Sequence, residues 1–409
     1  MEWIGQVPEH WKVARVKRLA SLRNERRNDV STDTIYIGLE DVEAGSGQYK
    51  PTNGSSRQSE DSTVGIFYEG DVLYGKLRPY LRKAIISEMA GCCSTEFLVL
   101  RAEKTEPRWL QEWLLTPDVT HQIESGCEGA KMPRADWGHI GSIEVVYPDQ
   151  PEQAKILTSL DRETARIDAL IEKKTRFIEL LKEKRQALIT HAVTKGLDRN
   201  AKMKDSGIEW IGQVPEHWKV ARVKRLASLR NERRNDVSTD TIYIGLEDVE
   251  AGSGQYKPTN GSSRQSEDST VGIFYEGDVL YGKLRPYLRK AIISEMAGCC
   301  STEFLVLRAE KTEPRWLQEW LLTPDVTHQI ESGCEGAKMP RADWGHIGSI
   351  EVVYPDQPEQ AKILTSLDRE TARIDALMDK AKQSITLLKE RRAAFITAAV
   401  TGQIDLRGK

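Results

Sequence analysis

Residues 151–193 read PEQAKILTSLDRETARIDALIEKKTRFIELLKEKRQALITHAV, and their periodicity decides the architecture of the chain. Apolar side chains recur in alternating steps of four and three residues, which is the heptad pattern of a helix that packs against another helix. Proline and glutamate open the stretch, and both are favoured in the first turn of a helix. We predict one helix of roughly 60 Å, at about 1.5 Å per residue, that cannot bury its apolar seam alone. The predicted seam consists of Leu160, Thr164, Ile167, Ile171, Lys174, Ile178, Leu181, Arg185 and Leu188.

An internal repeat without a single substitution supplies a second helix of the same kind. Residues 2–170 recur letter for letter as residues 209–377 of the 409-residue chain. The sequence therefore predicts two copies of one folding unit, each followed by a long helix. The second seam consists of Leu367, Thr371, Ile374, Met378, Ala381, Ile385, Leu388, Arg392 and Phe395.

Each seam is the obvious partner of the other. Two identical units related by a twofold axis would set the helices antiparallel, with one globular domain at each end. The repeat stops at residue 170, inside the first helix, and beyond it Lys174 corresponds to Ala381 and Phe177 to Ser384. This divergence favours a specific intramolecular pair. The alternative is that each helix forms a homodimeric coil with another molecule.

The part of each copy before the helix has a mixed pattern. Short β-branched or aromatic runs alternate with Gly, Pro and Asn turns, and residues 109–115 and 119–125 form amphipathic stretches. This pattern predicts an α+β domain, and the Gly-, Ser- and Asn-rich segment 45–62 predicts a long loop within it. The predicted division of the chain is a first domain at residues 1–150, a first helix at 151–197, a linker at 198–208, a second domain at 209–357, and a second helix with a tail at 358–409.

Composition excludes several classes of protein. Charged residues make up 30% of the chain, no apolar run reaches the roughly 20 residues that span a bilayer, and no signal peptide opens the sequence, so we expect a soluble, cytoplasmic protein. Residues 2–150 hold 18 Lys and Arg against 23 Asp and Glu, a net charge of −5. A protein that coats nucleic acid indiscriminately should be basic throughout, so this balance allows only a locally basic groove.

No catalytic or metal-binding pattern stands out. Cys92, Cys93 and Cys127 and their copies form no CxxC pair and have no His at ligand spacing, which predicts buried reduced thiols. None of the seven histidines forms a recognisable catalytic arrangement, and no methyltransferase motif occurs. We therefore expect no catalytic residue, no metal and no cofactor.

The segment GDVLYGKL at residues 70–77 matches the start of a phosphate-binding loop. The position that must be Ser or Thr to hold Mg²⁺ is Leu77, and Pro79 stands where the phosphate-binding helix should begin. The interior of the loop is apolar and strand-like, so we predict a core strand containing Tyr74.

Concentrated positive charge inside an acidic domain is the strongest functional signal. The segment KLRPYLRK at residues 76–83 holds four cations in eight residues without an acid, and KMPR at 131–134 follows a Gly-rich stretch. Lys and Arg on turns bind phosphate, whereas the polar loop with Asn53, Ser55, Arg57 and Gln58 is suited to base edges. The candidate DNA-binding residues are Lys76, Arg78, Tyr80, Arg82, Lys83, Lys131, Arg134 and Arg57, and in the second copy Lys283, Arg285, Tyr287, Arg289, Lys290, Lys338, Arg341 and Arg264.

A third basic cluster carries less weight. It consists of Arg15, Lys17, Arg18, Arg23, Arg26 and Arg27. Because its arginines alternate with Glu25 and Asp29, a solvated face offset by nearby acids explains this cluster about as well as a DNA contact does.

Several motifs together resemble the specificity subunit of type I restriction-modification systems. They are SGIEWIGQVPEHW at 206–218, GDVLYGKLRPY at 70–80, CSTEF at 93–97, MPRADW at 132–137, EQAKI at 152–156 and LDRETARID at 160–168. The resemblance covers nearly the whole chain and recurs in both halves. It implies two target-recognition domains, each followed by a long helix, with the helices packed antiparallel.

The resemblance also implies a function and partners. Each domain of such a subunit reads one half of a bipartite site in double-stranded DNA, and two modification subunits, which bind S-adenosylmethionine and methylate adenine, dock on it; motor-nuclease subunits join for restriction. We therefore expect a non-catalytic recognition subunit. Because the two domains here are identical, a twofold arrangement predicts a gapped palindrome, with half-sites presented on one face of the duplex.

Two other classes of function stay open from the sequence. A nucleotide hydrolase that acts on DNA would use the loop at residues 70–77, although Leu77 and the lack of a Walker-B run argue against it. A coiled-coil scaffold whose globular ends bind protein would show no salt-dependent affinity for DNA.

Overall fold

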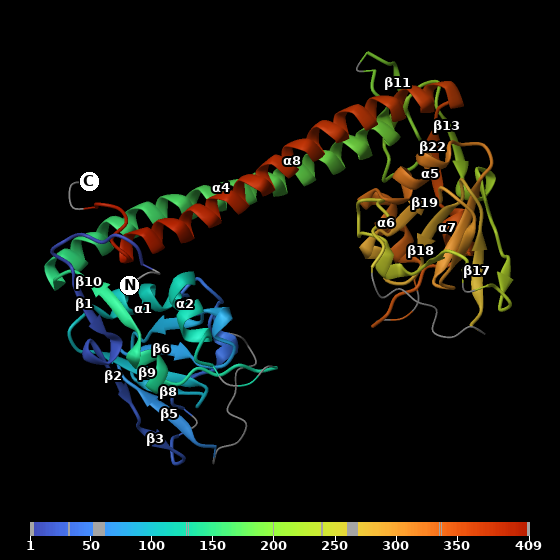
Figure 1. The fold of residues 1–409 in the computed structure, drawn as a ribbon. Helices are drawn as coiled ribbons and strands as arrows, with labels where there is room; N and C mark the ends of the chain where they lie inside the picture. Colours follow the sequence, from blue (N-terminus) through green and yellow to red (C-terminus); the bar gives the residue numbers. More distant parts are fainter. Residues whose placement is uncertain are drawn as a thin grey trace. The chain divides into compact units, whose positions relative to one another are not determined.

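A computed structural model describes the chain except residues 1–3, 32, 52–61, 128, 130, 199, 239, 260–268, 335, 337 and 407–409. Two compact units result, one made of two separate segments of the chain and one of a continuous segment (Figure 1). Unit 1 comprises Met1–Thr175 and Lys382–Lys409, and unit 2 comprises Arg176–Ala381. Each unit therefore contains one copy of the repeated domain, the beginning of the helix that follows it, and the end of the other helix.

The domain of unit 1 is built from short strands and three short helices. Its strands are β1 (Lys12–Arg15), β2 (Ala20–Arg23), β3 (Arg26–Arg27), β4 (Tyr36–Ile37), β5 (Val64–Phe67), β6 (Val72–Gly75), β7 (Ala84–Ile86), β8 (Gly91–Cys93), β9 (Phe97–Ala102) and β10 (Glu144–Tyr147). Its helices are α1 (Pro107–Leu115), α2 (Pro117–Glu124) and α3 (Trp137–Ser142), with 3₁₀ turns η1 (Val16–Arg18), η2 (Leu39–Asp41) and η3 (Pro79–Leu81).

Two four-stranded sheets organise this domain. One has the order β2-β9-β6-β7 and is antiparallel throughout; the other has the order β3-β5-β8-β4, with β4 and β8 parallel. A separate antiparallel pair joins β1 to β10 near the start of the long helix. The run Val72-Leu73-Tyr74 is fully buried because β6 lies in the middle of its sheet, between β9 and β7. Helix α1 packs on β6, β7 and β9, and its Trp113 and Leu114 enter the main apolar core.

The domain of unit 2 repeats this arrangement. Its strands are β13 (Lys219–Arg222), β14 (Ala227–Leu229), β15 (Arg233–Arg234), β16 (Tyr243–Ile244), β17 (Val271–Phe274), β18 (Val279–Gly282), β19 (Ala291–Ile293), β20 (Gly298–Cys300), β21 (Phe304–Ala309) and β22 (Glu351–Tyr354). Its helices are α5 (Pro314–Leu321), α6 (Pro324–Ser332) and α7 (Trp344–Ser349), with 3₁₀ turns η4 (Val223–Arg225), η5 (Leu246–Asp248) and η6 (Pro286–Leu288). The sheet orders match those of unit 1 strand for strand.

The two long helices are α4 (Gln150–Lys195) and α8 (Gln357–Val400). Within each unit their segments lie side by side and antiparallel (Figure 1). In unit 1, Leu160 of α4 shares an apolar cluster with Val400 of α8, while Arg392 of α8 pairs with Asp168 at 3.0 Å. In unit 2, Arg185 of α4 pairs with Asp375 of α8 at 3.2 Å. All eighteen seam residues named above are buried or half-buried.

The α+β class, the seams and the intramolecular pairing predicted from the sequence are confirmed within each unit. The alternative of homodimeric coils is wrong, because each seam already meets the other helix of the same chain. Helix α4 begins at Gln150, one residue before the predicted start, and continues to Lys195. The predicted linker at residues 198–208 is not a plain connection, since β11 (Met203–Asp205) pairs with β12 (Gln213–Pro215). The boundaries given for the two recognition domains stay a prediction.

The chain termini of unit 1 close against each other. Ile4 and Trp11 share an apolar cluster with Val400 and Leu406, and Gln403 Nε2 donates to Ile4 O at 3.4 Å. In unit 2 the segment between α4 and β13 fills the corresponding place, with Ile208, Val214 and Trp218 packed on α4 and α8. In unit 1 the start and the end of the chain thus pack together on the long helices, whereas in unit 2 one continuous segment packs there.

Candidate nucleic-acid interface

The basic segment at residues 76–83 forms a tight turn after strand β6. Gly75 N donates to Lys83 O at 2.8 Å, which closes the turn across its base. Inside it, η3 is flanked by Arg78 at φ 53° and Arg82 at φ 47°, both in the left-handed region. A non-glycine residue is strained there and keeps this conformation only where its surroundings hold it. The same two angles recur at Arg285 and Arg289 of the second copy.

The second basic segment, KMPR at residues 131–134, holds this turn in place. Arg78 N donates to Pro133 O at 2.9 Å, and Ala135 N donates to Lys76 O at 2.9 Å. Leu77 and Arg134 form an isolated antiparallel bridge. The fold therefore brings together two segments that lie about 50 residues apart in the sequence. We call the side chains of Lys76, Arg78, Tyr80, Lys131 and Arg134 the basic turn surface, and those of Lys283, Arg285, Tyr287, Lys338 and Arg341 its second copy.

Exposure differs among these side chains. Tyr80 is 49% exposed, Met132 is 55% exposed and Lys131 lies at the surface, whereas Lys76 and Arg78 are half-buried. Arg134 is already paired, because its Nη2 and Nε donate to the two carboxylate oxygens of Glu96 at 3.0 and 3.3 Å. Arg341 pairs with Glu303 in the same way. A phosphate would have to compete with this exposed ion pair, which is worth little in water.

Arg82 and Lys83 have structural partners inside the domain. Lys83 Nζ donates to Leu39 O at 2.6 Å, and Lys290 Nζ to Leu246 O at the same distance. Arg82 Nη1 donates to Leu115 O at 3.4 Å. These two cations hold backbone carbonyls, so of the basic segment Lys76, Arg78 and Tyr80 are the side chains best placed to meet a ligand. Arg57, Arg264 and the polar loop with Asn53, Ser55 and Gln58 lie outside the described residues.

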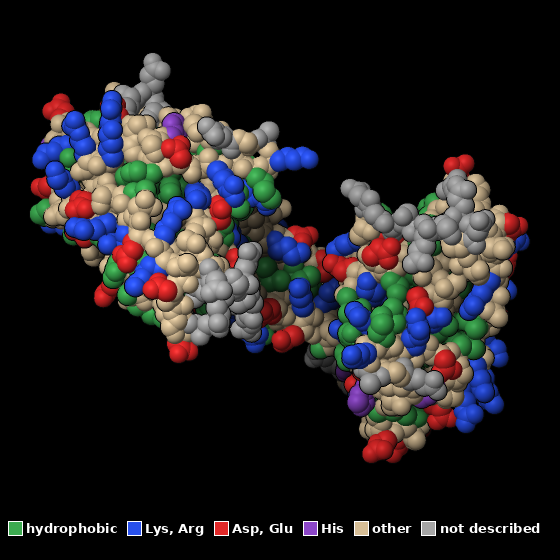
Figure 2. Space-filling model, turned by 90° about the horizontal axis from the view of Figure 1, so that it is seen from below, with side chains coloured by type: hydrophobic (Ala, Val, Ile, Leu, Met, Phe, Trp, Pro, Cys, Tyr) green, Lys and Arg blue, Asp and Glu red, His purple; other side chains and the backbone are tan. Residues whose placement is uncertain are grey.

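Two arginines of the third basic cluster, Arg23 and Arg27, are paired with acids. Arg23 donates to Asp71 at 2.8 Å and lies over the ring of Tyr68, and hydrogen bonding to the Asp71 carboxylate raises the pKa of this arginine. Arg27 pairs with Asp29 at 3.2 Å. Figure 2 shows the same alternation over a wider area, with Asp and Glu side chains scattered among Lys and Arg on the visible face. The interpretation of this cluster as a solvated face agrees with these contacts.

The segment GDVLYGKL is a core strand, as predicted. Tyr74 is buried in β6, and desolvation raises the pKa of its hydroxyl. Cys92 and Cys93 are buried in β8 as thiols outside any disulfide, and burial raises the pKa of Cys93 to about 12. Cys127 is half-buried and also unpaired. The prediction of buried reduced thiols is confirmed for Cys92 and Cys93, whereas Cys127 is only half-buried.

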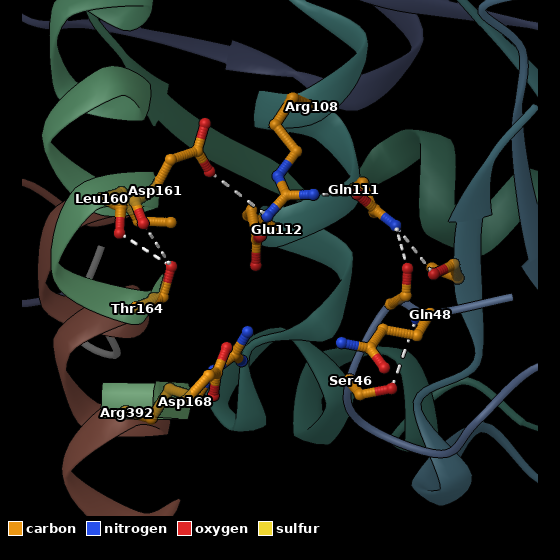
Figure 3. A network of polar contacts seen from close by, with 12 residues as sticks. Ser46, Gln48, Arg108, Gln111, Glu112, Leu160, Asp161, Thr164, Asp168 and Arg392 are labelled. Carbon is orange, nitrogen blue, oxygen red and sulfur yellow. Dashed lines mark hydrogen bonds and ion pairs between the residues drawn. The ribbon is translucent and has the colours of Figure 1, made fainter. Parts of the chain in front are cut away.

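A polar junction that sequence reasoning missed connects α1 to the two long helices (Figure 3). Arg108 Nη2 lies 2.6 Å from the buried carboxylate of Glu112 and 3.7 Å from Asp161 of α4. Burial raises the pKa of Glu112, while Arg108 and Arg392 act in the opposite direction. Gln111 Nε2 donates to Gly47 O and Ala84 O, which ties α1 to the loop after η2. The i, i+4 spacing of Arg108 and Glu112 is the only part of this junction that the sequence could have shown.

The start of α4 is fixed by two further residues. Gln153 is fully buried, accepts hydrogen bonds from Thr105 Oγ1 and Glu106 N, and donates to Pro148 O. Glu152 accepts from His10 Nε2 at 2.8 Å and from Trp11 Nε1 at 3.3 Å. This histidine therefore has a structural partner 142 residues away. The same contacts recur between His217, Trp218 and Glu359 in unit 2.

Comparison with known proteins gives relatives from type I restriction systems. No family model matches the chain. The type I restriction enzyme EcoDI specificity subunit of Escherichia coli is 22% identical over 346 residues, which covers 81% of this chain and 74% of that protein. The resemblance inferred from the motifs is therefore confirmed.

Solved structures show the same fold. A chain from a structural study of complex assembly and conformational transition of the type I R-M system has a TM-score of 0.71 at 16% identity, over 98% of this chain and 100% of that chain. The crystal structure of the HsdS subunit from Thermoanaerobacter tengcongensis has a TM-score of 0.53 at 17% identity, over 98% of both chains. At these identities the likeness establishes the fold.

No three His, Cys, Asp or Glu side chains among the described residues are grouped as metal ligands would be. Within the same part of the chain, none of the helices combines the length and the apolar composition needed to cross a membrane.

Proposed function

We propose that this chain is the DNA sequence-specificity subunit of a type I restriction-modification system. It binds a bipartite, gapped site in double-stranded DNA and docks the subunits that methylate adenine N6, and motor-nuclease subunits join the same assembly for restriction. The chain itself supplies no catalytic group and no cofactor, and S-adenosylmethionine is bound by the partner subunits. The fold shared with solved type I chains and the relation to the EcoDI specificity subunit support this assignment.

The observation that carries the proposal is the duplication of one domain with the same surface in both copies. In each copy, one turn carries two strained arginines and an exposed tyrosine. The neighbouring KMPR segment adds a lysine beside this turn. Backbone turns rich in Lys and Arg are typical of phosphate contacts, which position a protein on the duplex. Because these domains are acidic overall, DNA affinity has to come from such confined surfaces.

Identical domains also define the symmetry of the target. If a twofold axis relates the two identical domains, each domain reads the same half-site, and the second domain reads it on the opposite strand. The proposed target is therefore an interrupted palindrome. Sequencing of methylated adenines in DNA modified by the chain with its methyltransferase subunits should show two inverted copies of one half-site. Two unrelated half-sites would contradict the proposal.

The basic turn surface can be tested in the same assembly. The variant Lys76→Ala, Arg78→Ala, Lys283→Ala, Arg285→Ala should weaken binding to target and non-target DNA alike, and lower the slope of log affinity against log salt by about 0.9 for each lost phosphate contact. The matched control is Arg101→Ala with Arg308→Ala, which removes exposed arginines from the ends of β9 and β21.

Three results distinguish the alternatives. A changed sequence preference would make these side chains base readers rather than phosphate contacts. An unchanged affinity and salt slope would remove the basic turn surface from the DNA interface. A parent chain whose assembly binds DNA without any salt dependence would favour a protein-binding scaffold over a specificity subunit.

A further inference from the structure

The two globular domains share one sequence, but different helix segments support them. In unit 1 the end of α8 packs beside the domain, and in unit 2 the end of α4 takes this place. These two helix ends are outside the repeat. At corresponding positions α4 has Gln186 and α8 has Ala393. The supporting helix can therefore make the two copies of the domain differ.

In unit 2 the helix reaches the basic segment of the domain. Arg289 Nη1 donates to Gln186 Oε1 at 3.0 Å and to Leu322 O at 3.3 Å. The first bond joins a cation to a carbonyl oxygen and has good geometry for an N–H···O hydrogen bond. Helix α4 is thus connected directly to the residue that ends η6.

In unit 1 the corresponding place is hollow. Arg82 Nη1 donates to Leu115 O at 3.4 Å, a longer contact than either bond of Arg289. The methyl group of Ala393 cannot supply an acceptor. A cavity of about 550 Å³ opens between the domain and the helices, and Arg82, Ala393, Lys389, Gln48 and Thr116 are among its lining residues. Ser46, Glu112, Asp168 and Arg392, which are labelled in Figure 3, also line this cavity.

The affected arginine lies at the end of the turn that carries the tyrosine of the basic turn surface. Arg82 and Arg289 each end a 3₁₀ turn in the left-handed region, and the turn carries Tyr80 or Tyr287 at its exposed tip. Residues in this conformation depend on contacts around them. A hydrogen bond donated by the guanidinium to the helix restricts the turn, and a copy without that bond should open more often.

We infer that Gln186 is a positioning residue for the second recognition domain, and that the first domain lacks its equivalent because Ala393 stands there. The chain is therefore a reader with two identical domains whose basic turn surfaces differ in rigidity. The consequence for DNA rests on the proposed function, whereas the difference in rigidity does not. One hydrogen bond corresponds to about a threefold to tenfold change in an opening equilibrium.

Hydrogen exchange of the full-length chain tests the difference in rigidity. Peptides from the two copies have equal masses, so the experiment uses Met89→Leu, an exposed substitution between β7 and β8 that shifts the mass of first-copy peptides covering residues 76–89. In this background the turn at residues 285–290 should exchange about threefold to tenfold more slowly than the turn at 78–83. Gln186→Ala should bring the second copy to the rate of the first.

The reverse substitution keeps the test decisive. Ala393→Gln should slow exchange in the first turn, since the cavity leaves room for the longer side chain. Ala394→Gln is the matched control, because it adds the same side chain one residue further on α8 at an exposed position outside the cavity lining. Equal exchange in the two turns of the parent, or no response to Gln186→Ala and Ala393→Gln, would overturn the inference.

DNA binding then shows whether the difference reaches the target. Lys283→Ala with Arg285→Ala should weaken binding about threefold to tenfold more than Lys76→Ala with Arg78→Ala, and Ala393→Gln should remove this gap. Equal losses in the two double variants would overturn the consequence for DNA. If neither pair affects binding while the exchange rates differ, the proposed interface fails and the positioning role of Gln186 stands.

Discussion

The two halves of the chain share the contacts within the repeated domains more closely than the contacts made by the helix ends that support these domains. Tyr74 pairs with Leu98 in unit 1 as Tyr281 pairs with Leu305 in unit 2, and Arg23 and Arg230 each lie 2.8 Å from their aspartate partner. The bond that Arg289 donates to Gln186, in contrast, has no counterpart between Arg82 and Ala393. These internal contacts of the domain thus form alike on two unlike supports.

This difference shows which contacts stabilise the domains and which stabilise the long helices. The domain buries its own core, in which Trp113 or Trp320 packs on the central sheet. The helices have no core of their own, because a single helix cannot bury an apolar seam. Their pairing therefore depends on each other and on the domain, and substitutions can be chosen to separate the two contributions.

The largest effect is expected from the domain core. Trp113→Ala removes a nearly fully buried ring and should destabilise unit 1 by about 3–5 kcal/mol. Differential scanning calorimetry should show one part of the unfolding transition moved to lower temperature. Trp320→Ala is the matched variant and should move the other part equally. If either variant shifts the whole transition as one, the domains are not independent folding units.

A smaller effect should follow from the ion pairs of the helix seam. Arg392→Ala leaves Asp168 without its partner and should cost about 1–2 kcal/mol in urea unfolding. Arg185→Ala, which breaks the pair with Asp375, serves as the comparison in unit 2. Exchanging the charges with Arg392→Asp and Asp168→Arg should recover part of the loss. No recovery would mean that arginine packing, rather than the pair, stabilises the seam.

The buried glutamates of α1 and α5 predict a pH dependence. Burial raises the pKa of Glu112 and Glu319, so their contribution to stability is complete below the unfolded pKa and decreases as pH rises through the folded pKa. The double variant Glu112→Gln, Glu319→Gln should therefore gain stability relative to the parent between about pH 4 and pH 7. Urea titrations at both pH values measure this difference. A relative loss with rising pH would show that the pairs with Arg108 and Arg315 outweigh burial.

The smallest effect concerns cysteine reactivity, which should be equal in the two halves. Burial and a pKa of about 12 keep Cys93 and Cys300 protonated and inaccessible, while Cys127 and Cys334 are half-buried. Mass spectrometry after labelling at about pH 8 should find two modified thiols per chain before unfolding and six after it. Early labelling of Cys93 would contradict the described packing of β8.

Much of the fold could be predicted because its signals are periodic and local. The heptad spacing of the seam residues predicted the long helices, and the exact repeat predicted two copies of one domain. Apolar runs such as that of β6 predicted core strands. The sequence predicted a plain linker at residues 198–208 and missed the pairing of β11 with β12. This pairing depends on a turn between the two strands, and no periodic apolar pattern indicates that turn. Among the proposed DNA contacts, Arg82 and Lys83 proved to hold carbonyls, which charge clustering alone does not distinguish from a ligand site.

The sequence by itself determined that two copies of one α+β domain alternate with two helices whose seams must pair. Only the tertiary structure decided which cations have partners within the fold. Arg134 contacts Glu96, 38 residues away in the sequence, and Arg289 contacts Gln186, 103 residues away. Helical and strand periods arise from backbone geometry within a few residues and are visible in the sequence. Partners of polar side chains are set by chain segments that meet only after folding, so identical sequences acquire different contacts on different supports.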